Sequence, residues 1–172
     1  DKVMLTFGVT GSQEQCDAAY QLALKFCAEH GGVEGDKALG KKWAHGRYSA
    51  PYLRDPMLDA GYAVDTMETA IDWNRVTQSV ERIETDIRNA LQDEGELVHS
   101  YTHLSHVYGQ GSSIYTTYLF RCGGSYEQSM KRWQKLKAAG AQAIVACGGT
   151  ISHQHGVGSD HREYISAEKG AL

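Results

Sequence analysis

The densest group of chemically versatile residues lies near the C-terminus, between Gly148 and His161. Three histidines, His153, His155 and His161, fall within nine residues, and four glycines accompany them. Imidazole gives or accepts a proton near neutral pH, and glycine lets the backbone approach a flat or anionic ligand closely. The segment therefore predicts acid–base chemistry on a bound small molecule.

A metal site or a phosphate loop would use similar residues. His153 and His155 could ligate a metal with a third ligand from His99, His103 or His106, but no cysteine or carboxylate constellation completes a tetrahedral set. No G-x-G-x-x-G lies between a strand and a helix, and no Gly-Lys-Ser/Thr triplet occurs. We expect neither metal nor phosphate loop, and keep the metal as an alternative.

Hydrophobic periodicity predicts the elements that must position this segment. Period-2 alternation predicts strands at 3–9, 62–71, 97–108 and 114–122, whereas 3.6-residue periodicity predicts helices after Ser12, over 73–91 and after Ser125. Ser12 and Ser125 each precede a Gln by three residues, the spacing of a capping box. The order β-α-β-α-β-β-α predicts one α+β domain over 1–172, a ferredoxin-like antiparallel sheet with helices on one face.

The last predicted strand has two chemically different faces. One face holds Ile114, Thr116, Tyr118 and Phe120, and the other holds Tyr115, Thr117, Leu119 and Arg121. If the helices cover the first face, Tyr115 points away from the core. An uncovered sheet face meets water, a partner or a ligand. Tyr115 is therefore a candidate site residue, with an ordinary exposed strand tyrosine as the alternative.

Composition excludes several classes of protein. The net charge of −4, from 17 basic and 21 acidic residues, and the lack of a basic stripe argue against nucleic-acid binding. The longest apolar run, 141–147, is too short to cross a bilayer. The four cysteines show no CxxC spacing; we expect Cys16, Cys27 and Cys147 to be buried free thiols, which suits a cytoplasmic setting.

Four other residues are expected to have structural or solvent roles. His99 and His103 are expected as exposed strand residues, and His161 as a solvated loop residue. Trp73 begins the periodic helix pattern and is expected to anchor the core. The face of His106 depends on the length of the preceding turn, which the pattern does not settle.

Several segments resemble one known family in order and spacing. The segment 148–158 resembles the C-terminal signature of FAD-linked oxidases of the vanillyl-alcohol-oxidase superfamily, closest to the alkyldihydroxyacetonephosphate synthase (alkylglycerone-phosphate synthase) branch and its bacterial relatives. The segments 52–55 and 65–73 and the hairpin within 103–115 agree with the same family. The resemblance covers the chain from about Ala50 onward, and the first fifty residues only in pattern.

The resemblance implies a cap, or substrate, domain whose sheet covers the flavin ring of FAD. Arg54 would hold a carboxylate or acyl leaving group, and Tyr115 would act with a histidine in proton transfer. His153 and His155 would line the flavin–substrate cavity as general base and hydrogen-bond partner. The same resemblance places His106, Gln154, Gly156 and Gly158 on the cofactor side.

One position departs from the family pattern. The synthase branch has three consecutive histidines where this chain has His153-Gln154-His155, and Gln154 cannot accept a proton at physiological pH. The resemblance implies the alkyl-for-acyl exchange of ether lipid biosynthesis, and this departure keeps open the cap of a flavin-dependent 2-hydroxy-acid or alcohol dehydrogenase. A non-catalytic ferredoxin-like binding module is the alternative of another class.

The resemblance also bears on partners. It implies a parent polypeptide with an N-terminal FAD-binding domain and a C-terminal tail, so we expect this chain to be a fragment that is inactive alone. FAD would be held mainly by the other domain, and the substrate would be a small or lipid-like molecule. Peripheral membrane association of the parent and a homodimer stay open.

Overall fold

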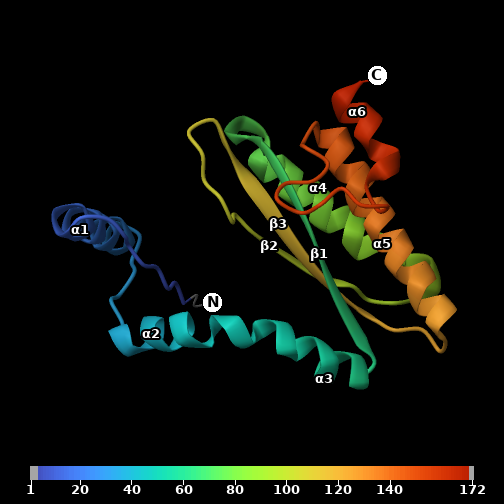
Figure 1. The fold of residues 1–172 in the computed structure, drawn as a ribbon, viewed down its shortest axis with the longest axis horizontal. Coiled ribbons are helices and arrows are strands. Elements are labelled where there is room, and N and C mark those ends of the chain that lie inside the picture. Colours follow the sequence, from blue (N-terminus) through green and yellow to red (C-terminus); the bar gives the residue numbers. More distant parts are fainter. Residues whose placement is uncertain (1–3, 171–172) are drawn as a thin grey trace. The chain divides into compact units, whose positions relative to one another are not determined.

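The computed structural model describes residues 4–170, which divide after Leu53 into two units. The first unit contains α1 (Gln13–Glu29), α2 (Lys37–Gly46) and a 3-10 helix (Arg47–Leu53) (Figure 1). The capping box predicted at Ser12 is confirmed, because Ser12 and Gln15 exchange side-chain-to-backbone hydrogen bonds. None of residues 4–53 is buried.

The strand predicted at 3–9 is wrong wherever the structure describes it. Residues 4–10 are irregular, and residue 3 lies outside the described residues. Alternation supplies a strand with two faces, but a strand also needs a neighbour for its backbone hydrogen bonds. The sheet consequently has three strands in the described chain, instead of the four expected for a ferredoxin-like fold.

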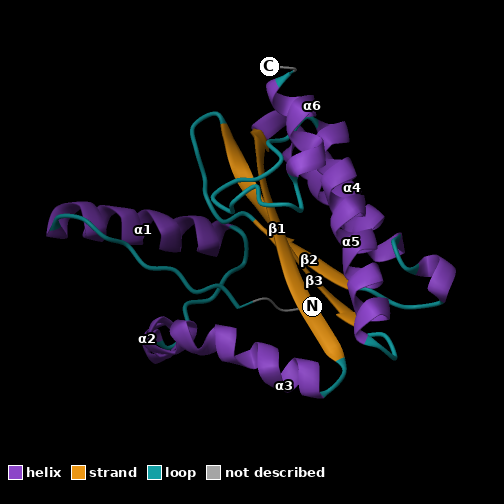
Figure 2. Cartoon of the chain, turned by 45° about the vertical axis from the view of Figure 1, so that its right-hand side comes forward, coloured by secondary structure: helices purple, strands orange, loops and turns teal. Residues whose placement is uncertain are grey.

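The second unit is an α+β domain built on a three-stranded antiparallel sheet, in the order β1-β3-β2 (Figure 2). In chain order its main elements are α3 (Arg54–Asp59), β1 (Tyr62–Asp72), α4 (Val76–Asn89), β2 (His99–His103), β3 (Gly111–Arg121), α5 (Tyr126–Cys147) and α6 (Ile165–Lys169). The predicted helices and the three later strands are all present. β2 is shorter than the predicted 97–108, because residues 104–106 interrupt the strand before Val107 pairs with Ser112 in an isolated bridge.

Helices α4 and α5 pack on one face of this sheet, as predicted (Figure 1). The core includes Met67 and Tyr118 from the sheet together with Ile87 from α4 and Leu136 from α5, all essentially without solvent exposure. A Cβ on Gly140 would overlap the sulfur of Met67, so glycine lets α5 approach β1 closely. The helix-covered face therefore forms a dense apolar layer.

The strand register places Tyr115 on the opposite face. Glu68 of β1 and His103 of β2 are the cross-strand partners of Tyr115. Ile114 and Thr116, its neighbours, are buried on the helix side, whereas Tyr115 is only partly buried. The predicted assignment of the two faces is confirmed.

Three predictions about single residues need correction. Trp73 does not anchor the core: it is 42% exposed, and its indole N–H donates to the carbonyl of Tyr108 at the hairpin. His161 is buried, because the segment around it folds into a turn in which its amide N–H donates to the carbonyl of Val157. The four cysteines are free but only partly buried.

Candidate functional site

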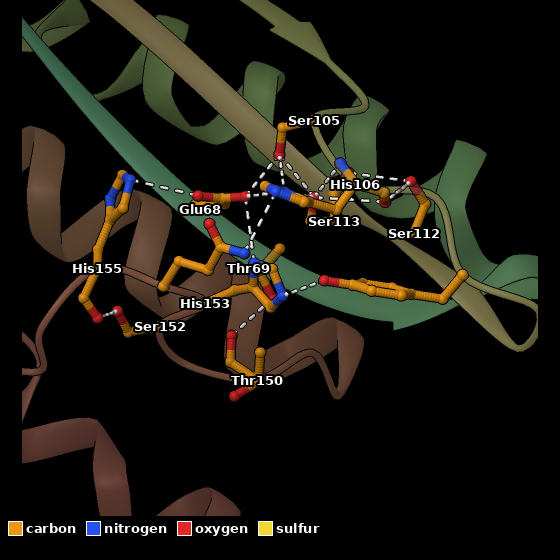
Figure 3. Close-up of polar contacts among 12 residues, drawn as sticks. Glu68, Thr69, Ser105, His106, Ser112, Ser113, Thr150, Ser152, His153 and His155 are labelled. Carbon is orange, nitrogen blue, oxygen red and sulfur yellow. Dashed lines mark hydrogen bonds and ion pairs between the residues drawn. The ribbon is translucent and has the colours of Figure 1, made fainter. Parts of the chain in front are cut away.

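A buried carboxylate lies at the centre of the open face. Glu68 points away from the helices, yet only 3% of its side chain is exposed because three histidines surround it (Figure 3). One oxygen, Oε1, lies 3.2 Å from Nδ1 of His153 and 3.5 Å from Nδ1 of His106. The other, Oε2, lies 3.2 Å from Nε2 of His155. A carboxylate buried this deeply requires such partners.

Two serines complete the surroundings of this carboxylate. The hydroxyl of Ser105 donates to Glu68 Oε1 at 2.5 Å and also lies 2.6 Å from the hydroxyl of Ser113 (Figure 3). Burial raises the pKa of Glu68, but hydrogen bonds from Ser105, His153 and Ser113 outweigh it and bring the pKa below its ordinary value of 4.5. Glu68 is therefore an anion at neutral pH.

Residues 148–161 form a glycine–histidine loop, which reaches the open face by pairing with the outer edge of β1. Helix α5 ends at Gly148, which has a left-handed conformation with φ 70°. The amide of Thr150 then donates to the carbonyl of Ala70, and the amide of His153 donates to the carbonyl of Glu68. These bonds carry the loop around the sheet edge, so both of its histidine side chains arrive beside Glu68.

Helix α6 fixes the same loop from its other side. The carboxylate of Glu168 accepts hydrogen bonds from the amide of Ile151 at 2.8 Å and the hydroxyl of Thr150 at 3.0 Å. Lys169, the Ile151 amide and Thr150 together lower the pKa of Glu168 despite the opposing effect of burial. The ionised Glu168 side chain thus holds the loop at Ile151, two residues before His153.

A tight turn separates the two loop histidines. Gln154 is the one non-glycine residue with positive φ in the described chain, at 59°, and the amide of His155 donates to the carbonyl of His153 at 2.7 Å. Such a conformation costs free energy in a residue with a side chain. Here it aims His153 and His155 at different oxygens of Glu68.

The second ring nitrogens of His153 and His106 also have partners. His153 Nε2 lies 3.0 Å from the hydroxyl of Tyr108, and His106 Nε2 lies 3.2 Å from the side-chain amide of Gln154. Tyr115 meets the ring of His155 edge-on, with their centroids 5.4 Å apart. The arrangement links two tyrosine side chains, three imidazoles and one carboxylate.

The structure brings together five of the residues singled out from sequence: His106, Tyr115, His153, Gln154 and His155. It does not bring Arg54 into this cluster. Its side chain is exposed at the start of α3 and makes no hydrogen bond or ion pair with another residue in the part of the chain that the structure describes.

The two glycines assigned to the cofactor side continue the loop. Gly158 has a positive φ of 54°, whereas a Cβ on Gly156 would meet no atom within 4 Å. The packing of this chain therefore does not itself require glycine at 156. The backbone at Gly156 is exposed.

Sequence reasoning missed Glu68, Ser105, Ser113 and Tyr108 as site residues. Glu68 stands between Met67 and Thr69 in the alternating pattern of β1. The strand register places it on the same face of the sheet as Tyr115. A carboxylate in the middle of a strand, where Asp and Glu are depleted, was a signal.

The fold and site place this chain in a defined class. All of it, residues 1–172, matches the family described as FAD linked oxidases, C-terminal domain, and the chain belongs to that family. No helix among residues 4–170 is both long and apolar enough to cross a membrane.

Its relatives include alkyldihydroxyacetonephosphate synthases. The enzyme from Dictyostelium discoideum is 33% identical over 130 residues, covering 75% of this chain and 21% of that protein. The enzyme from Caenorhabditis elegans is 24% identical over 164 residues, covering 94% of this chain and 27% of that protein. A solved alkyldihydroxyacetonephosphate synthase structure superimposes with a TM-score of 0.66 at 20% identity, over 91% of this chain and 28% of that one. The chain thus spans about a quarter of these relatives.

Proposed function

We propose that this chain is the substrate-side domain of an FAD-dependent enzyme, in which the cluster around Glu68 moves a proton at the reacting carbon. The observation that carries the proposal is the convergence of three histidines, from two segments far apart in the sequence, on one buried carboxylate. Family membership supports FAD as the cofactor of the parent enzyme. Its FAD-binding domain would be the partner in the same polypeptide.

The residues present fit a flavin placed over the open face. Gly156 has no side chain, and an added Cβ would meet no atom within 4 Å, so a flat ring can approach the backbone at this position. The exposed amide of Gln154 and the ring of His106 offer hydrogen-bonding groups beside it. When bound, FAD supplies an electron-accepting centre. This chain would supply only part of the surface that holds it.

Glu68 orders the proton carriers in this proposal. His153 donates from Nδ1 to Glu68 Oε1, which leaves Nε2 to accept from the hydroxyl of Tyr108. Nε2 of His155 lies 3.2 Å from Glu68 Oε2, and the ring lies edge-on to Tyr115. The carboxylate thereby sets which nitrogen of each ring carries hydrogen, as catalytic histidines require.

Tyr115 and His155 are placed to exchange a proton with the substrate. Tyr115 is partly exposed on the open face and contacts His155, whose Nδ1 is free when Nε2 donates to Glu68. Proton transfer by a positioned side chain contributes about 10²–10⁴-fold to rate. Arg54 would hold an acidic group of the substrate, reached when the full active site is assembled.

Two reaction classes fit these residues, and the synthase relatives support the first. In an alkyldihydroxyacetonephosphate-synthase-like exchange, a fatty alcohol would replace an acyl group; in a dehydrogenase, a hydroxy acid or alcohol would be oxidised. Gln154 favours the second, because an amide cannot act as a base. A module without chemistry has no use for a carboxylate held by three histidines.

Replacement of Tyr115 tests the proposal in the flavin-containing parent enzyme. Tyr115→Phe should lower kcat by about 100-fold or more while the bound flavin keeps its absorbance. Tyr101→Phe is the matched control, because Tyr101 lies two residues from His103 on the same face of β2 and does not touch His155. Wild-type turnover in Tyr115→Phe would contradict the proposed role.

A further inference from the structure

The three side chains Glu68, His106 and His153 are spaced like metal ligands. One ligand atom from each lies within 4.8 Å of the other two. Nδ1 of His153 and Nδ1 of His106 are 3.2 and 3.5 Å from Glu68 Oε1. Bonds of about 2.0–2.1 Å to a tetrahedral Zn²⁺ place neighbouring ligand atoms about 3.3 Å apart. Both distances to Glu68 Oε1 are close to this spacing, and the ligand atoms of the two histidines lie within 4.8 Å of each other.

The surroundings of the two imidazoles also suit a metal site. A metal-bound histidine usually donates its second ring N–H to a neighbouring oxygen, which fixes the orientation of the ring. Here Nε2 of His153 faces the Tyr108 hydroxyl, and Nε2 of His106 faces the Gln154 amide, which presents its oxygen after rotation about its terminal bond. Both outer partners are already in place.

We propose that Glu68, His106 and His153 bind a divalent transition-metal ion, and that the bound ion inhibits the enzyme. Two imidazoles and a carboxylate select Zn²⁺ or Co²⁺ over Mg²⁺ and Ca²⁺, which prefer oxygen ligands. The ion takes the lone pair on Nδ1 of each imidazole, so the ring hydrogen sits on Nε2. His153 then donates to Tyr108 and no longer to Glu68.

Inhibition follows because the ion occupies the groups that would order proton transfer. With Nδ1 of His153 bound to the metal, the ring hydrogen sits on Nε2, so His153 can no longer accept from Tyr108 and Glu68 no longer fixes its tautomer. This consequence rests on the proposed function, whereas metal binding itself does not. His155 contacts the opposite oxygen, Oε2, and is outside the three-ligand group.

Binding is tested on the 172-residue chain by titration with Co²⁺, followed by visible absorption, and with Zn²⁺, followed by calorimetry. One ion should bind, with d–d absorption bands, and His106→Gln or His153→Gln should weaken binding at least tenfold. Tyr108→Phe should weaken it about tenfold, as loss of an outer partner does. Circular dichroism establishes that each variant is folded.

His103→Gln is the matched control for binding. His103 lies on the same open face and stacks on Tyr115, but it is not among the three ligands. Its replacement should leave the affinity for Zn²⁺ unchanged. Absence of saturable binding, or an equal loss in His103→Gln and His106→Gln, would overturn the site.

Inhibition is tested separately in the flavin-containing enzyme. Turnover should fall over the same Zn²⁺ concentrations at which the chain binds Zn²⁺, and a chelator should restore it. His106→Gln should raise the Zn²⁺ concentration for half-inhibition at least tenfold, each variant being compared with its own metal-free rate. If the chain binds Zn²⁺ and turnover is unaffected, the inhibitory role is wrong and the binding site stands.

Discussion

Asp65 and Glu68 of strand β1 lie on opposite faces of the sheet, and different kinds of donor hold them. Asp65 faces the helices, where its Oδ2 accepts from the indole N–H of Trp133 at 2.6 Å and lies 3.1 Å from the ammonium of Lys137. Glu68 faces the open side and is held by histidines and serines. The donors to Asp65 are an indole and an ammonium, whereas those around Glu68 are imidazoles and hydroxyls.

Both carboxylates have pKa values below the ordinary range, for different reasons. Burial raises the pKa of Asp65, but the hydrogen bond from Trp133 and the charge of Lys137 together outweigh burial and lower the pKa below 3.8. Tyr118, which donates to Asp65, has its own pKa raised by burial and by the negative charge of Asp65, so it stays protonated. Asp65 therefore stabilises the packing of α5 on the sheet, whereas Glu68 organises groups that can react.

The largest effect on stability is expected from Asp65→Asn. It removes the charge that compensates the mostly buried Lys137 and should lower the free energy of unfolding by about 3 kcal/mol. Urea unfolding measures the change. Asp72→Asn is the control on the same strand, because the Asp72 side chain is about half exposed, and it should change stability little. Equal effects of the two substitutions would contradict the structural role of Asp65.

Glu68→Gln should show the opposite balance between activity and stability. The substituted amide keeps the shape of the side chain but cannot accept from both loop histidines and Ser105 at once, so the rings lose their fixed orientation. We expect kcat of the flavin enzyme to fall about tenfold to 100-fold, with its pH profile displaced and a smaller loss of stability than in Asp65→Asn. A change in stability alone, with wild-type kcat and pH profile, would show that Glu68 is only structural.

The two carboxylates also illustrate which features of the fold and site could be predicted from the sequence. Helix α4, the α1 capping box and the two faces of β3 depend on local spacing, and each was predicted correctly. Glu68 and His153 are 85 residues apart, and they meet because backbone groups of an aperiodic loop pair with a strand edge. No period in the sequence encodes that pairing. The strand expected at 3–9 failed for the converse reason: residues 4–10 have the alternation and no partner.

Glu168 tests whether the loop must be clamped for Glu68 to act. Glu168→Ala removes the acceptor for the Ile151 amide and the Thr150 hydroxyl, so the loop should open more often at its pairing with β1. Hydrogen exchange at the amides of Ile151 and His153 should become faster, and kcat of the flavin enzyme should fall about tenfold, a loss of about 1.4 kcal/mol. Glu168→Gln, which retains an acceptor oxygen, should restore most of both.

Unchanged exchange in Glu168→Ala would show that strand pairing alone holds the loop. Glu163→Ala is the control for surface charge in the same region, because Glu163 is exposed and makes no ion pair in the described residues. It should leave exchange in the loop unaffected. The comparison separates a specific clamp from a general loss of negative charge.

The smallest effect concerns His161, a buried titratable group in the segment between α5 and α6. Burial lowers its pKa below 6.5, assisted by the charges of Lys137 and His155 and opposed by Asp160 and Asp65. The unfolded chain therefore binds this proton more readily, so stability should be complete above about pH 6.5 and fall as the pH drops through the folded pKa.

His161→Gln should flatten the loss of stability between about pH 7 and about pH 5, measured by urea unfolding at each pH. An unchanged slope in this variant would assign the loss to other groups. The carboxylates do not obscure this window, because Asp65 and Glu68 lose their contributions only below their ordinary pKa values of 3.8 and 4.5. The difference in slope between His161→Gln and the unsubstituted chain therefore reports on His161.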